Sequence, residues 1–99
     1  MKPDVQLENG CLRVTGDIDP ETVVAVRRLG ETLIAQDSGE LEVDLSALGA
    51  AHSVVLSLLL CWVRHARARQ MSLVFTGASE RLRSLAALSG LQHHLKGMA

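Results

Sequence analysis

The residue pair with the clearest chemical potential is His52-Ser53, which stands between a strand-like segment and a very apolar helical segment. A histidine beside a serine suggests a hydroxyl nucleophile activated by an imidazole, but such a pair also needs an acid to orient the imidazole. Asp44 is the nearest candidate acid, and it lies several residues upstream. The glycine-flanked serine of a nucleophile elbow is absent from the sequence. We therefore expect no catalytic residue and no enzymatic activity here.

Histidine and cysteine residues give no metal pattern. His93 and His94 are adjacent, and the nearest other histidine in the sequence is His65. No cysteine or carboxylate stands at ligand spacing from this pair. Cys11 and Cys61 are far apart and form no C-x-x-C motif, so no disulfide framework is predicted. We expect no metal site and no cofactor.

The length of 99 residues fits one domain spanning residues 1–99, and because Trp62 and Phe75 are the two aromatic residues of the sequence, its core is expected to be mainly aliphatic. The net charge of −1 argues against nucleic-acid binding. Residues 1–44 carry ten acids and four bases, whereas residues 45–99 carry one acid and six bases. This asymmetry could give the molecule a partner-facing positive side, whereas the simpler interpretation of any single arginine is a solvated helix face. The basic residues of the positive side are Arg64, Arg67, Arg69, Arg81, Arg83 and Lys96.

The start of the chain has no apolar core of a signal peptide, and its longest apolar stretch, residues 54–63, is too short to span a bilayer. We therefore expect a cytoplasmic protein without a membrane span.

Hydrophobic periodicity predicts seven elements in the order β-β-α-β-α-β-α. Two alternating runs around Asn9-Gly10 predict a hairpin. Asp19, Pro20 and Glu21, with Asp17 nearby, are typical of a helix start, and this acidic cluster needs no other role. The later elements are a strand at 40–44, a helix at 53–69, a strand at 71–75 and a helix from the Ser79 cap to residue 88. Because helices link the later strands, we expect an α/β fold with a small mixed sheet and helices packed on it.

The helix at 53–69 is apolar on more sides than a small domain can bury. With Ser53 as its cap, the predicted core face is formed by Val55, Leu56, Leu59, Leu60, Val63 and Ala66. An apolar flank beside it is predicted to bind a partner or to pair two copies of the chain. The predicted partner-binding residues are Ser53, Val54, Ser57, Leu58, Cys61, Trp62 and His65. The alternative is that Leu58 and Trp62 pack under a neighbouring helix.

Three segments resemble the STAS domain family in their order and spacing. They are Val43-Asp44-Leu45-Ser46 with the hydroxyl and apolar helix that follow, Gly16-Asp17-Ile18-Asp19, and residues 79–91. The resemblance covers almost the whole chain and implies a single STAS domain. The chain is most similar to the small standalone STAS subunits of bacterial phospholipid-transporting ABC complexes.

That resemblance implies a non-enzymatic cytoplasmic subunit, peripheral to the inner membrane. It would bind the ATPase subunit of a complex that also contains a permease, and would support ATPase assembly and activity. The transporter would move phospholipids between the inner and outer membranes and so maintain outer-membrane lipid asymmetry.

The alternative within the family is an anti-sigma-factor antagonist, which the resemblance implies would be switched by phosphorylation of Ser53. Such antagonists usually carry Asp-Ser followed by a small residue and glycine. Here His52 replaces the acid, and Val54 and Val55 add bulk after the hydroxyl. These differences favour a constitutive apolar contact over a phosphorylation switch.

Overall fold

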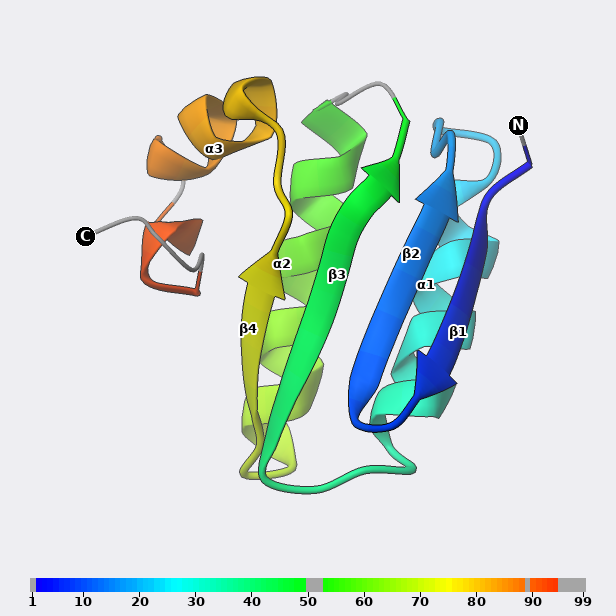
Figure 1. Ribbon diagram of the computed structural model, residues 1–99, viewed down its shortest axis with the longest axis vertical. Helices are drawn as coiled ribbons and strands as arrows, with labels where there is room; N and C mark the ends of the chain where they lie inside the picture. The colour runs from blue at the N-terminus through cyan, green and yellow to red at the C-terminus, as the bar shows by residue number, and fades with distance from the viewer. Residues whose placement is uncertain (1, 50–52, 89, 95–99) are drawn as a thin grey trace.

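Four strands form one mixed sheet, and two helices cover one of its faces (Figure 1). The computed structural model describes residues 2–49, 53–88 and 90–94. The strand order is β1-β2-β3-β4, with β1 antiparallel to β2 and the other neighbours parallel. In Figure 1, α1 lies behind β1 and β2, α2 lies behind β3 and β4, and α3 stands beside β4. The predicted fold class and element order are confirmed, and a short 3-10 helix, Leu91–His94, follows α3.

The predicted hairpin joins β1 (Asp4–Glu8) to β2 (Cys11–Gly16). Asn9 and Gly10 have positive φ angles of 50° and 75°, as the two central residues of a type I′ turn require. In both strands, alternate side chains point toward the helices, and Val5, Leu12 and Val14 are buried there. The alternation of apolar and polar residues in the sequence therefore predicts correctly which face of these two strands is buried.

The first helix, α1 (Val23–Ile34), begins later than predicted. The Asp19 carboxylate accepts the backbone N–H groups of Glu21 and Thr22, both at 2.9 Å, and so caps a turn that precedes the helix. Asp19 therefore stabilises this turn, whereas the N-cap of α1 is Thr22, which makes no side-chain capping hydrogen bond. The prediction that Asp19 caps the helix itself is wrong. The apolar spacing of Val23, Val26, Leu29, Leu33 and Ile34 in the sequence predicts that they share one buried face of this helix. Leu29 departs from that prediction and is 41% exposed.

The strand β3 (Glu40–Leu48) extends beyond its predicted end at residue 44 because its pairing with β2 continues as far as Leu48. The backbone N–H of Gly49 then donates to the Gly16 carbonyl at 2.7 Å. The strand β4 (Ser72–Thr76) is displaced by one residue from the prediction. The ends of β2 and β3 thus lie together at the end of the sheet from which the chain leads to α2 (Ser53–Ala68).

The last α-helix, α3 (Glu80–Ala87), has the predicted Ser79 cap, whose Oγ accepts the Leu82 backbone N–H at 3.2 Å. Gly90 has a positive φ of 82°, the left-handed conformation that glycine favours after a helix, and Leu91 after it is buried. Leu82 and Ala86 are also buried, so α3 packs its inner side on the core.

Candidate partner-binding site

Ser53 is the first residue of α2 and is exposed. The helix therefore begins one residue earlier than it would with Ser53 as its cap. His52, the residue before it in the sequence, lies outside the described residues. Ser53 makes no side-chain hydrogen bond to a histidine or a carboxylate in the part of the chain that the structure describes.

Two predicted contact residues on α2 belong to the core. Leu58 is 1% exposed and Trp62 is 0% exposed. The prediction that they form an exposed apolar flank is wrong, and the alternative that they pack under a neighbouring helix is correct. A side chain with no exposed surface cannot contact a partner without rearrangement of the core.

The neighbouring helix is α1, and a glycine allows the close approach. A Cβ atom on Gly30 would overlap the Trp62 indole, so the ring occupies the space that a side chain would fill. The indole Nε1 donates to the Arg27 carbonyl of α1 at 3.2 Å, which satisfies the polar end of the buried ring. Because Trp62 faces α1 and Leu58 is buried one helical turn before it, the buried side of α2 is rotated toward that helix compared with the prediction. Its members are Val55, Leu58, Leu59, Trp62, Val63 and Ala66.

The rotation leaves a continuous row of accessible side chains along α2. Ser53 and Ser57 are exposed, and Val54, Cys61 and His65 are partly buried. Leu56 and Leu60, both predicted to be core, are also only partly buried and border the serines on the other side. We call Ser53, Val54, Leu56, Ser57, Leu60 and Cys61 the α2 outer face. It combines the small hydroxyl side chains of two serines with aliphatic side chains that are partly accessible.

Basic side chains continue this surface toward the end of α2. Arg64 and Arg67 are exposed on the helix. Arg69, just after it, reaches across to α1, where Nη2 donates to the Ala35 carbonyl at 3.3 Å. Part of the predicted positive side is thus adjacent to the α2 outer face; Lys96 lies outside the described residues.

His65 lies in a groove between α1 and α2 rather than on the outer face. A depression of about 450 Å³ is lined there by His65 together with Arg28, Glu31, Thr32 and Ala35. The Nε2 atom of His65 is buried and has no hydrogen-bond partner among the described residues. Thr32 and Glu31 are engaged within α1, since Thr32 donates to the Arg28 carbonyl and Glu31 pairs with Arg27.

Asp44, the candidate orienting acid, is committed to the sheet. Its Oδ1 accepts the Ser46 backbone N–H at 2.9 Å, and Arg13 lies 3.7 Å away. Hydrogen bonds from Ser46, assisted by Arg13, lower the pKa of Asp44. The Asp44 carboxylate is therefore engaged in contacts that stabilise the folded structure.

Cys11 is the neighbouring thiol on the same sheet face. Its pKa is raised by burial and by the nearby carboxylates of Glu42 and Asp44. It therefore lacks the low pKa of a reactive cysteine.

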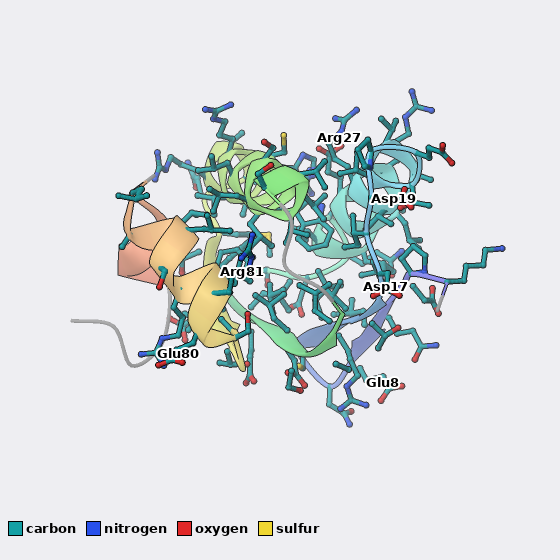
Figure 2. All side chains as sticks on the ribbon, turned by 90° about the horizontal axis from the view of Figure 1, so that it is seen from above. Glu8, Asp17, Asp19, Arg27, Glu80 and Arg81 are labelled. Atoms are coloured by element: carbon teal, nitrogen blue, oxygen red, sulfur yellow. The ribbon has the colours of Figure 1, made fainter. Side chains whose placement is uncertain are left out.

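The acidic side chains of the cluster before α1 do not point toward a common site. Figure 2 shows Asp17 and Asp19 as separate side chains beside α1 and the end of the sheet. The Asp17 carboxylate lies next to Gly49, where a Cβ atom would overlap it. Within the described ranges, no three histidine, cysteine or acidic residues form a group that could hold a metal ion. The same ranges contain no helix with the length and apolarity needed to cross a membrane.

The fold and the sequence together define the class of protein. The family model described as "Mlab, STAS domain" matches residues 1–97, and the chain therefore belongs to the STAS domain family. Within that family the chain is MlaB-like. A chain of the Acinetobacter MlaFEDB complex in an ATP-bound conformation is 30% identical with a TM-score of 0.74, and the match covers 93% of this chain and 97% of that one.

Anti-sigma-factor antagonists share the fold at lower identity. The unphosphorylated form of SpoIIAA matches with a TM-score of 0.76 at 19% identity, over 95% of this chain and 85% of that one. An antagonist from Mycobacterium paratuberculosis matches with a TM-score of 0.69 at 23% identity, over 96% and 82%. Comparison with curated protein sequences finds no match.

Proposed function

We propose that this chain is the non-enzymatic STAS subunit of an MlaFEDB-like ABC transporter, where it binds the ATPase subunit and supports its assembly and activity. The transporter would move phospholipids between the two bacterial membranes and thereby maintain lipid asymmetry. The observation that carries the proposal is the near end-to-end match to a chain of the Acinetobacter MlaFEDB complex. In this role the protein is cytoplasmic and peripheral to the inner membrane.

The α2 outer face is the proposed contact surface. Ser53 and Ser57 are exposed and small, so a partner can approach the helix backbone closely between the aliphatic edges of Val54, Leu56 and Leu60. Cys61 belongs to the same surface, and His65 lies at its border with α1. Leu58 and Trp62 support this surface from the core and do not touch the partner.

The mechanism is a shift of populations. A subunit that binds the assembled, competent ATPase more tightly than the free one stabilises the assembled state in proportion to that difference in affinity. This mechanism requires a preformed contact surface and no chemical step.

Co-purification tests the proposal. The chain is co-expressed with the ABC ATPase and permease encoded in its own genome, and the ATPase is expected to co-purify at moderate salt. Ser57→Arg should abolish recovery by placing a bulky cation in the contact. Ser72→Arg, the same change at an exposed serine of β4, should leave recovery unchanged. Equal recovery of the ATPase with both variants would refute the proposed surface. No recovery of the ATPase with the wild-type chain would refute the proposed function.

The antagonist alternative differs in the behaviour of Ser53. A phosphorylation switch predicts phosphate on Ser53 in cells and release of a kinase partner by Ser53→Asp. The transporter role predicts unmodified Ser53 by mass spectrometry and continued ATPase binding by Ser53→Ala.

A further inference from the structure

The outer edge of β1 is open. β1 is a terminal strand of the sheet, and no described element lies beyond it in the plane of the sheet (Figure 1). At the opposite edge, α3 and the 3-10 helix lie beside β4. The β1 edge is also distant from α2 in the layer arrangement, because α1 lies behind β1.

The hairpin geometry shows which backbone groups are available. Glu8 and Cys11 flank the two-residue turn and form a hydrogen-bonded pair. Starting from Glu8, the residues of β1 that hydrogen-bond to β2 therefore alternate with residues whose backbone groups point away from β2. The N–H and C=O groups of Val5 and Leu7 therefore point outward. Oδ1 of Asp4 accepts the Val5 N–H at 2.8 Å, whereas no described side chain accepts that of Leu7.

A mainly apolar cavity lies next to this edge. It has a volume of about 220 Å³ between the start of β1 and α1, with Pro3, Ala25, Val26 and Leu29 as its apolar lining. Leu29 is 41% exposed at its border, although the sequence pattern places it on the buried face of α1. Lys2, Asp4 and Glu21 are the charged residues around it.

The two sides of β1 differ in chemistry. Val5 and Leu7 lie on the side of α1, whereas Asp4, Gln6 and Glu8 lie on the open face, where they are exposed. A strand added at this edge would alternate in the same way, with every second side chain near Leu29 and the others beside Asp4 and Glu8. Those carboxylates favour cationic residues at the open-face positions.

We propose that the outer edge of β1 and the Leu29 cavity bind an extended peptide segment in which apolar residues alternate with lysine or arginine. The Val5 carbonyl and the N–H and carbonyl groups of Leu7 hold the added strand, α1 accepts its apolar side chains, and Asp4 and Glu8 pair with its cations. This surface is additional to the α2 outer face and does not depend on the transporter role.

A second copy of the chain fits this edge poorly. In the antiparallel register that pairs all of β1 with itself, Asp4 lies opposite Glu8 of the second copy. Like charges directly opposite each other destabilise a strand pair. The charges of β1 therefore select a basic segment over self-pairing.

Titration with a short capped peptide of alternating lysine and valine tests the proposal, monitored by amide chemical shifts of the whole chain. We expect saturable shifts at Val5, Leu7 and Leu29. A peptide N-methylated at alternate residues should bind at least about tenfold more weakly because it loses backbone hydrogen bonds. A glutamate–valine peptide should not bind.

Protein variants complete the experiment. Leu29→Ser and Asp4→Lys should each weaken peptide binding several-fold, whereas Leu88→Ser, the same change at an 88% exposed leucine at the C-cap of α3, should not. ATPase recovery should be unchanged by Leu29→Ser, which separates this surface from the proposed function. Absence of binding, equal binding by the N-methylated peptide, shifts confined to residues outside β1 and α1, or a dimer paired through β1 would overturn the proposal.

Discussion

The Trp62 indole occupies the position that a side chain on Gly30 would take. This relationship brings α1 and α2 together and fixes the rotation of α2 about its axis. It turns Leu58 and Trp62 inward and leaves Ser53 and Ser57 outside. The composition of the α2 outer face is therefore a consequence of a glycine on the neighbouring helix.

Gly30→Ala is expected to destabilise the protein, although alanine favours helix formation by about 1 kcal/mol over glycine. The new methyl group would displace the indole, and such overpacking costs about 1–3 kcal/mol. Urea unfolding should show a lower midpoint. In a double-mutant cycle with Trp62→Leu, the two changes should be strongly non-additive. A Gly30→Ala protein at least as stable as the wild type would contradict the close packing.

Leu58 and Leu60 should respond differently to truncation. Leu58→Ala removes a fully buried side chain and should reduce the free energy of unfolding by about 2–5 kcal/mol. Leu60→Ala removes a partly exposed one and should cost clearly less. Chemical denaturation of both variants checks the rotation of α2. If the face predicted from the sequence were the buried one, Leu60 would be in the core and Leu60→Ala would cost more stability than Leu58→Ala.

The sequence pattern was sufficient for the strands, the hairpin turn, the Ser79 cap and the element order, because local periodicity and turn residues determine these features. It was insufficient for the rotation of α2. The helix is apolar on several sides, so its own residues allow more than one buried face, and the contact with α1 selects among them. The features of the sequence that could have indicated this contact were Gly30 in the middle of a helix and the single tryptophan, Trp62. The exposure of Leu29 also depends on tertiary context, because β1 is the terminal strand of the sheet and no strand beyond it among the described residues covers Leu29.

Asp44 should make the stability depend on pH in the acid range. Hydrogen bonds from Ser46 and the nearby Arg13 lower its pKa in the folded state. Its stabilising contribution is therefore complete above the unfolded-state pKa of about 3.9 and is lost as the pH falls through the lower folded-state value. Asp44→Asn should cost stability at pH 7 and progressively less as the solution is acidified. A difference in unfolding free energy that stays constant from neutral to strongly acidic pH would argue against this carboxylate interaction.

Cys11 should react slowly with alkylating reagents at neutral pH. Burial and the carboxylates of Glu42 and Asp44 raise its pKa, which reduces the thiolate fraction. In a Cys61→Ser background, iodoacetamide should modify Cys11 more slowly than free cysteine, and Glu42→Gln should increase the rate. Reaction as fast as that of free cysteine would be inconsistent with this environment.

Site-specific crosslinking tests the central claim most directly. A photo-crosslinking residue is placed at position 57 on the α2 outer face, or at position 72 on β4 as the control. Each variant is co-expressed with the ABC ATPase and permease of the same genome, irradiated and analysed by mass spectrometry. The account predicts an adduct between position 57 and the ATPase subunit, with none from position 72. An adduct from position 72 alone, or from position 57 to a kinase in place of the ATPase, would contradict it.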